Sequence, residues 1–180
     1  MSSEPGSRGS RLRSQIAWWL GISSAIIGIL AFFLTQCANK SPSFNQWKAK
    51  AIAACNQEVP GIVEADWKSI NTFRRLQPGN SVGSVEREEA ASAKRQFDMA
   101  VQHLVGTWRA LEQPDERQEE IKTMYEDAMA LAITYGDSAE AVRSNTYKDE
   151  LYDNEEKARV DLRNDIKSLD LENGCSSLAA

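Results

Sequence analysis

Histidine and cysteine, which supply most transition-metal ligands in proteins, are scarce in this 180-residue sequence. The one histidine is His103, and the three cysteines, Cys37, Cys55 and Cys175, lack the close paired spacing of a structural zinc site. A metal site built on several histidines is therefore excluded. His103 falls beside the apolar stripe of its segment, which favours a solvated side chain over a catalytic one. The sequence predicts no metal site and no cofactor.

Motifs of enzyme active sites are missing as well. The chain has no glycine-rich phosphate loop and no Gly-x-Ser-x-Gly nucleophile turn. An acidic run lacks the glycine-containing spacing of a calcium-binding EF-hand, so it is interpreted as solvated helix surface. The run consists of Asp149, Glu150, Asp153, Glu155 and Glu156. The sequence therefore indicates no catalytic residue and favours a protein that is not an enzyme.

Positive charge is in deficit. The chain carries 21 lysines and arginines against 26 aspartates and glutamates, and the first 37 residues hold three of the arginines and one of the glutamates. The remaining residues therefore carry a net charge of about minus 7, which repels phosphate backbones and disfavours binding to nucleic acid.

One long uncharged run stands near the N-terminus. Residues 16–35 read IAWWLGISSAIIGILAFFLT, and at about 1.5 Å per residue they match the roughly 30 Å hydrocarbon core of a bilayer. The alternative is a cleaved signal peptide, whose apolar region is usually about 7 to 15 residues long. The greater length and the absence of an Ala-x-Ala site favour an uncleaved transmembrane anchor over 15–36, after a basic tail at 1–14.

The flanks of the span predict its orientation. Arg11 and Arg13 lie directly beside its start, which favours a cytoplasmic N-terminus and an extracytoplasmic C-terminal part, residues 38–180. Trp18 and Trp19 are suited to anchor the same end among lipid headgroups. The predicted location is the cell membrane, crossed once.

Small residues recur along the span at four-residue spacing, which lets a second helix approach closely. The candidate partner in the bilayer is therefore another membrane protein or a second copy of the chain. The small residues are Gly21, Ser24, Ala25 and Gly28.

Cys37 has two interpretations. It follows Leu34-Thr35-Gln36, a pattern similar to the bacterial lipoprotein signal, in which the cysteine is lipidated. Gln36 departs from the small residue that such signals place before the cysteine, so an unmodified thiol at the membrane surface is favoured. Either outcome leaves the rest of the chain tethered to the same membrane face.

After a linker at 37–43, apolar residues recur at steps of three and four, the period of amphipathic helices. No segment alternates apolar and polar residues as a half-buried strand does. We therefore expect an all-α domain over 44–176, a disulfide-closed bundle of four or five helices with a tail at 177–180; the alternative is an extended coiled coil. The stripes are Phe44, Trp47, Ala51, Ala54 or Cys55; Val63, Trp67, Ile70, Phe73; Phe97, Val101, Leu104, Trp108, Leu111; Ile121, Met124, Ala128, Leu131, Tyr135; and Leu151, Ala158, Leu162, Ile166, Leu169.

Local signals predict the breaks between these helices. Pro60 with Gly61 separates the first two stripes, and Ser84 is suited to cap the third helix. Pro114 fits the first turn of the fourth helix, and Gly136 can take the left-handed conformation that ends it. Residues 138–172 then form one bent helix or two.

Cys55 and Cys175 stand near opposite ends of the predicted domain, which favours a disulfide between them in an oxidising compartment. The alternative is two unrelated buried thiols, since free cysteine is among the most often buried residues.

Several features together resemble small surface-anchored helical proteins of actinobacteria. They are the basic tail, the single span, the run from Trp47 to Cys55 followed by Pro60, and the terminal Leu-Glu-Asn-Gly-Cys175. The resemblance implies a location and a fold and no reaction. The predicted function is a non-catalytic, membrane-tethered interaction module, an accessory subunit of a membrane or envelope complex. The alternatives are a ligand-binding sensor domain and an enzyme of unrecognised type.

Overall fold

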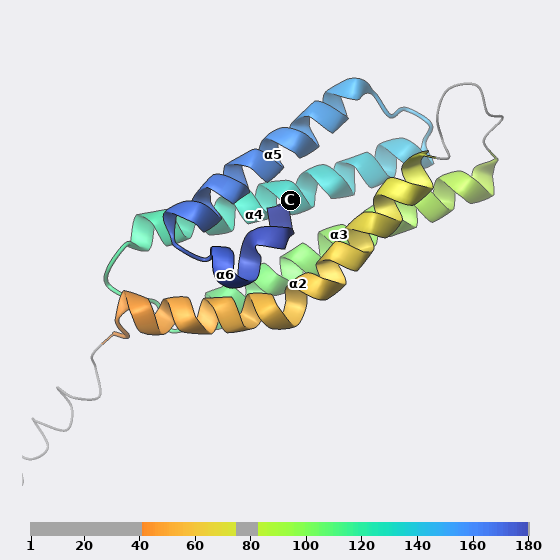
Figure 1. The fold of residues 1–180 in the computed structure, drawn as a ribbon. Helices are drawn as coiled ribbons and strands as arrows, with labels where there is room; N and C mark the ends of the chain where they lie inside the picture. Colours follow the sequence, from red (N-terminus) through yellow and green to blue (C-terminus); the bar gives the residue numbers. More distant parts are fainter. Residues whose placement is uncertain (1–40, 75–82, 180) are drawn as a thin grey trace, which may run out of the picture. The chain divides into compact units, whose positions relative to one another are not determined.

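The computed structural model describes residues 41–74 and 83–179, which form four long helices and a short helical segment at the end (Figure 1). Within these ranges there is no strand, so the all-α prediction is confirmed. The predicted span lies outside the described residues, and none of the helices inside them is both long and apolar enough to cross a bilayer. The elements are α2 (Phe44–Arg74), α3 (Ser84–Ala110), α4 (Gln118–Arg143), α5 (Asp149–Ser168), α6 (Glu172–Cys175) and the 3-10 helix η1 (Ser176–Ala179).

Consecutive helices pack side by side, α2 on α3, α3 on α4 and α4 on α5. Their apolar stripes form the core, as the periodicity predicts, because each helix buries the face that points to its neighbours. The largest side chains that are almost fully buried are Trp47, Ile62, Phe97, Leu104, Trp108, Ile121, Met124, Leu131, Leu162, Ile166, Leu169 and Leu171.

The first two predicted helices are one. α2 continues through Pro60, so the predicted break there is wrong, and Figure 1 shows α2 changing direction along its length. A proline removes one helical hydrogen bond and bends a helix whose packing holds both halves in place. α2 begins with a capping box: the Gln46 amide N–H donates to Ser43 Oγ at 3.3 Å, and the Ser43 amide N–H donates to Gln46 Oε1 at 3.2 Å.

The end of α4 also differs from the prediction. Gly136 lies inside α4 beside α3, where an added Cβ would come within 3.2 Å of Asp98 Oδ2. The helix ends instead before Asn145, which has a φ of 59°. The Thr146 amide donates to the Ala141 carbonyl at 2.8 Å and the Asn145 amide to Val142 at 3.2 Å, the hydrogen bonds of a Schellman motif. Residues 138–172 therefore hold the end of α4 and the separate helix α5.

Two predicted helix starts lie close to the observed ones. α3 begins at Ser84, but its N-cap is Gly83, so the predicted capping role of Ser84 is wrong. α4 begins at Gln118 rather than in the turn that holds Pro114, with Arg117 at its N-cap.

Two side chains donate hydrogen bonds to the free carbonyl groups at the end of α3. Tyr125 Oη donates to the Trp108 carbonyl at 3.1 Å, and Gln113 Nε2 donates to the Leu111 carbonyl at 2.8 Å.

Candidate functional site

The two outer helices of the bundle, α2 and α5, do not pack directly against each other. No Cα atom of α2 comes within 8 Å of a Cα atom of α5. We call the strip between them the seam. One part of it is filled by α6 and η1, which pack on both α2 and α5 (Figure 1). Along the rest, side chains of the described residues reach from one helix to the other.

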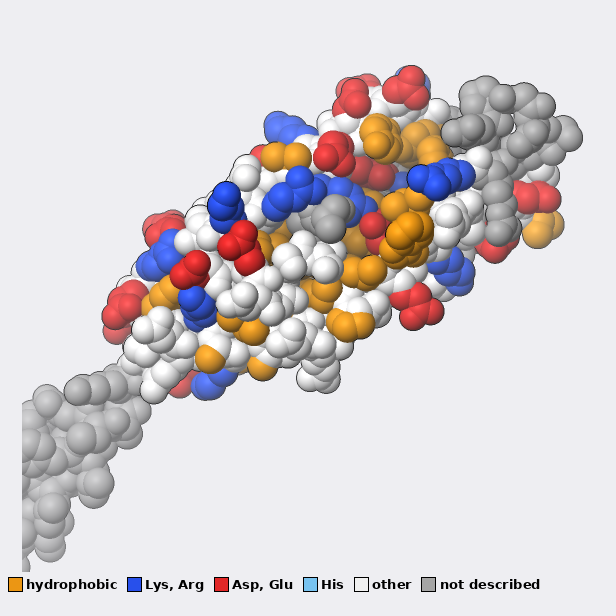
Figure 2. All heavy atoms as spheres, in the orientation of Figure 1, with side chains coloured by type: hydrophobic (Ala, Val, Ile, Leu, Met, Phe, Trp, Pro, Cys, Tyr) orange, Lys and Arg blue, Asp and Glu red, His pale blue; other side chains and the backbone are white. Residues whose placement is uncertain are grey.

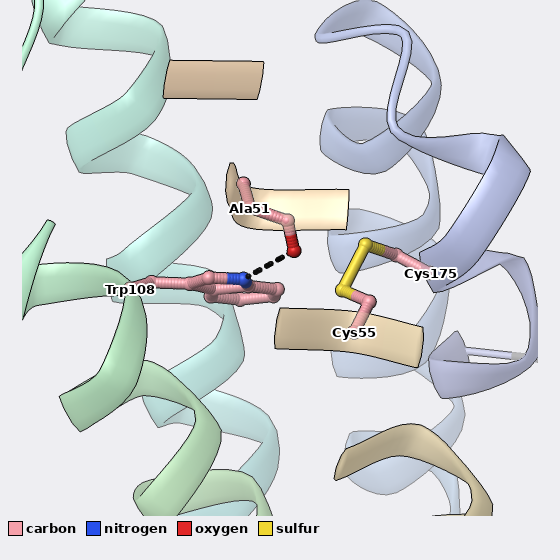
Figure 3. The surroundings of a disulfide bond; sticks show 4 residues. All are labelled: Ala51, Cys55, Trp108 and Cys175. Atoms are coloured by element: carbon pink, nitrogen blue, oxygen red, sulfur yellow. Dashed lines mark hydrogen bonds between the residues drawn. A yellow bond between two sulfur atoms is a disulfide. The ribbon is translucent and has the colours of Figure 1, made fainter. Parts of the chain in front are cut away.

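The filled part of the seam is fixed covalently. Cys55 of α2 and Cys175 of α6 form a disulfide, with their Cα atoms 5.2 Å apart, which confirms the predicted pairing. Figure 3 shows the bond one helical turn from Ala51, whose carbonyl oxygen accepts a hydrogen bond from Trp108 Nε1 at 3.4 Å. Gly174 permits this approach, because an added Cβ would lie 2.9 Å from the Ile52 carbonyl oxygen. The end of the chain is thereby pinned to the first helix.

Beyond η1, a charged side chain from each helix reaches across the seam. Arg159 Nη2 of α5 lies 2.6 Å from Asp66 Oδ1 of α2, and Tyr135 Oη donates to the same oxygen at 2.9 Å. The guanidinium lies over two rings, 5.5 Å from the centroid of Phe97 and 5.4 Å from that of Tyr135. This ion pair is mostly buried, so it is screened little by solvent. It links α2 to α5 directly.

A second ion pair lies deeper. Lys94 Nζ of α3 is 2.7 Å from Glu155 Oε1 of α5, and their side chains are only 4% and 8% exposed. The ammonium group also lies within 6 Å of three ring centroids, at 5.3 Å from Phe73, 4.7 Å from Tyr135 and 5.7 Å from Tyr147. Aromatic faces attract cations, so the rings and the carboxylate together hold a lysine in the core. The prediction that Glu155 belongs to a solvated acidic surface is wrong.

The surroundings shift the pKa values of the groups at the seam. Burial raises the pKa of Tyr135 far above its ordinary value, since an ionised phenolate would be poorly solvated there. Burial alone would lower the pKa of Arg159, but its contacts with Tyr135 and Asp66 outweigh burial and raise it. Both groups therefore keep their protons at neutral pH.

A carboxyl group on α5 also has a shifted pKa. Burial raises the pKa of Asp165 to about 7, and the nearby carboxyl groups of Asp127 and Asp161 raise it further in the same direction. A buried carboxylate is poorly solvated, and neighbouring negative charge disfavours its ionisation. The protonation state of Asp165 therefore changes near neutral pH.

Large apolar side chains are exposed on α2 and α5. Trp67 is 60% exposed and Tyr152 is 59% exposed, while Ile70 on α2 is exposed at 36%. Tyr152 precedes Arg159 by two helical turns, so both lie on the face of α5 that looks toward α2. Figure 2 shows hydrophobic side chains on both sides of the seam, with basic and acidic side chains between them. The predicted burial of Trp67 in a helix stripe is wrong.

Of the predicted site residues, only the cysteine pair falls in the described part of the chain. The membrane anchors, the small-residue face of the span and the lipidation candidate lie outside it, namely Arg11, Arg13, Trp18, Trp19, Gly21, Ser24, Ala25, Gly28 and Cys37. His103 is 68% exposed, as expected for a solvated side chain, with its Nδ1 3.2 Å from Glu58 Oε2. Among the described residues no three His, Cys, Asp or Glu side chains are grouped to hold a metal ion.

The buried ion pairs were not predicted, although the sequence holds one signal of a buried charge. Lys94 stands at helical spacing between Ala90 and Phe97, inside an otherwise apolar stripe. A charged residue at such a position is buried only when a partner neutralises it.

Comparison of the chain with protein family models, with characterised proteins and with solved structures finds no match.

Proposed function

We propose that the chain is a non-catalytic, membrane-tethered module whose helical domain lies outside the cytoplasm and binds another membrane or envelope protein. Residues 16–35 would be the tether, because their length and lack of charge suit a bilayer. The resemblance to surface-anchored helical proteins of actinobacteria agrees with this location. The observation that carries the proposal is the disulfide.

The disulfide supports an exported location because of where it lies. Both sulfurs are fully buried, and the bond joins residues 120 apart in the sequence. Closing so long a loop stabilises a fold by up to about 4 to 5 kcal/mol in the chain-entropy model. Such bonds persist in oxidising compartments and are rare in the cytosol. A domain whose last helix is held this way is suited to the cell envelope.

The chemistry of the seam favours binding over catalysis. Lys94 faces Glu155, and Arg159 faces Asp66, so the buried charges are used to neutralise one another. Tyr135 is held protonated by its raised pKa, which makes it a poor general base or nucleophile at neutral pH. What the domain offers a second molecule is the set of large apolar side chains exposed on α2 and α5.

Topology is tested by labelling. In the full chain with Cys37→Ser, Ser84→Cys places a thiol at the exposed start of α3, and Ser3→Cys places one in the predicted cytoplasmic tail. A maleimide that cannot cross membranes should label the first variant in intact cells and the second only after lysis. The reverse pattern would place the helical domain in the cytoplasm and overturn the proposal.

The interaction is tested separately on the full chain in its native membrane. Exposed lysines such as Lys122 allow amine-reactive cross-linking before detergent extraction and affinity purification. A membrane or envelope protein should be recovered as a covalent adduct with the chain. Recovery of the chain without any adduct, under conditions that cross-link a known membrane complex in the same cells, would contradict an interaction module.

A further inference from the structure

We propose that Asn173 is a site of non-enzymatic deamidation and isomerisation, and that the disulfide between Cys55 and Cys175 protects it while the bridge is closed. Reduction of the bridge makes the site reactive, and the isoaspartate that forms prevents the bridge from closing again. This inference concerns a covalent modification of the domain and goes beyond the proposed binding function.

The sequence places the reactive pair at one position. Asn173 is followed by Gly174, and no other asparagine of the chain precedes a glycine. Deamidation begins when the backbone nitrogen of the following residue loses its proton and attacks the side-chain carbonyl carbon of asparagine. A C–N bond forms, the side-chain amide leaves as ammonia, and a five-membered succinimide ring results. Glycine hinders this ring closure least, because it has no Cβ and its backbone is the least restricted.

The fold requires the glycine of this pair. A Cβ at position 174 would lie 2.9 Å from the Ile52 carbonyl oxygen and 3.0 Å from Ile52 Cγ2. This contact with α2 excludes a larger residue. The Asn173 side chain is exposed, so hydroxide can reach the pair to start the reaction, and water can open the succinimide at either carbonyl group to yield aspartate or isoaspartate.

With the bridge closed, the pair is held in an unreactive conformation. Asn173 and Gly174 belong to α6, and the Gly174 amide N–H donates to the Leu171 carbonyl at 3.2 Å. The attacking nitrogen is therefore engaged as a hydrogen-bond donor, which opposes loss of its proton. The helical backbone also turns this nitrogen away from the side-chain carbonyl carbon of Asn173. The ring can close only after the α6 turn opens.

The bridge opposes that opening. Cys175 directly follows the pair and is bonded to Cys55 of α2, with both side chains fully buried (Figure 3). α6 has only four residues, so its own hydrogen bonds stabilise it little. A dithiol cuts the bridge by two successive exchanges, in which the dithiol is oxidised to a disulfide and the two cysteines are reduced to thiols. Noncovalent contacts alone then hold the α6 turn, and it opens more often.

The isomerised product does not fit the closed structure. Isoaspartate routes the main chain through the side-chain carbonyl carbon, which adds one carbon atom to the backbone just before Gly174. The close approach of Gly174 to the Ile52 carbonyl oxygen leaves no room for this insertion. Cys175 then cannot return to the Cα–Cα distance of 5.2 Å at which it pairs with Cys55. Isomerisation therefore makes loss of the bridge permanent.

The test follows deamidation of the full chain, purified in detergent and carrying Cys37→Ser. The protein is incubated in heavy-oxygen water at mildly alkaline pH, with and without dithiothreitol, below the melting temperature of the reduced form. Peptide mapping measures the heavy oxygen incorporated at Asn173 and separates aspartate from isoaspartate. We expect the rate of conversion to rise by about tenfold or more on reduction, as an opening free energy of about 1.4 kcal/mol or more would give.

Two variants serve as controls. Thr146→Gly creates a second Asn–Gly pair at Asn145, in an exposed turn after α4 that carries no disulfide, and its rate should respond little to dithiothreitol. In Asn173→Gln the longer side chain would have to close a six-membered ring, which forms far more slowly. After the same incubation and removal of the reductant, this variant should recover the linked Cys55–Cys175 peptide fully. The unsubstituted residue should lose that peptide in proportion to the isoaspartate formed.

Each contrary outcome overturns a stated part of the proposal. Equal conversion of Asn173 with the bridge closed and reduced, or no conversion in either state, would remove the site as described. Equal acceleration at Asn145 and Asn173 would show that the fold as a whole, rather than the bridge, protects the pair. Isoaspartate as abundant in the re-formed linked peptide as in chains with a free Cys175 would overturn the permanent loss of the bridge.

Discussion

The buried pair between Lys94 and Glu155 permits a quantitative test of how the core is held. Replacing Glu155 with Met removes the carboxylate 2.7 Å from the lysine and leaves the ammonium group buried, with 4% of its side chain exposed. Breaking a buried pair in this way typically costs about 3 to 5 kcal/mol. The three rings around the ammonium group still stabilise it by up to about 2 kcal/mol. We therefore expect a loss near the lower bound, about 3 kcal/mol.

The double variant is the informative one. Lys94→Met with Glu155→Met removes both charges and keeps side chains of similar volume, which is often neutral or stabilising for a buried pair. Its free energy of unfolding should lie within about 1 kcal/mol of the unsubstituted domain, giving a coupling energy of about 3 kcal/mol or more between the two positions. Urea denaturation of residues 41–180 with the disulfide intact measures all four proteins.

A matched control lies one residue away. Arg95 Nη2 is 3.0 Å from Glu140 Oε2, but the side chains are 46% and 63% exposed. The same cycle of Met substitutions there should give a coupling energy below about 1 kcal/mol, since exposed ion pairs contribute little. If the buried and the exposed cycles give the same coupling, or if the Glu155→Met variant is as stable as the unsubstituted domain, then the buried pair does not hold α3 to α5.

Three further predictions concern the same domain. Trp108→Ala should lower the free energy of unfolding by about 3 to 5 kcal/mol, because Trp108 is fully buried, whereas Trp67→Ala should change it little; equal losses would contradict the described packing. Peptide mapping without reductant should recover one linked peptide containing Cys55 and Cys175, and reduction should lower the melting temperature; two free thiols from native membranes would remove the bridge. The folded pKa of Asp165 is raised to about 7, so between about pH 4 and pH 7 the folded domain binds one proton more than the unfolded chain. The free energy of unfolding relative to Asp165→Asn should therefore fall across this window as the pH rises and stay level above it. A difference that is independent of pH would refute the assignment.

The helices were predictable because the buried side chains of an amphipathic helix recur every three to four residues in the sequence. The stripes that contain Phe97, Trp108 and Leu131 repeat at the helical period, and these side chains are buried. The disulfide was predictable from chemistry rather than from geometry, since two cysteines in a domain expected to be exported have a reason to pair. Neither inference needs the relative positions of the helices.

Helix ends were harder to predict, because intrinsic helix propensity contributes less to stability than tertiary packing does. Pro60 and Gly136 look like breaks, yet α2 and α4 continue through them where neighbouring helices hold both sides. The real stops are Asn145 and Asp170, which adopt left-handed conformations with φ near 60°. Asparagine and aspartate tolerate this conformation better than other side chains with a Cβ. Neither position holds the glycine that most often marks the end of a helix, so these stop signals are easily missed.

The seam could not be predicted, because it depends on elements far apart in the sequence. The partners Asp66 and Arg159 are 93 residues apart, and Lys94 and Glu155 are 61 apart. In the sequence each of these four residues looks like a solvated charged side chain, because only the packing of α2, α3 and α5 brings the partners together. Only the position of Lys94 within an apolar stripe indicates that a partner must exist, and it does not say which of the many acidic residues supplies it.

The wedge of α6 and η1 explains why charged side chains, rather than apolar ones, join α2 to α5. By packing on both helices, this segment keeps their backbones more than 8 Å apart along the whole seam. A short apolar side chain cannot cross that gap. The extended guanidinium of Arg159 can, and it meets Asp66 while its flat face covers the Phe97 and Tyr135 rings. The disulfide that fixes the wedge therefore also helps to set the distance that the ion pair must span.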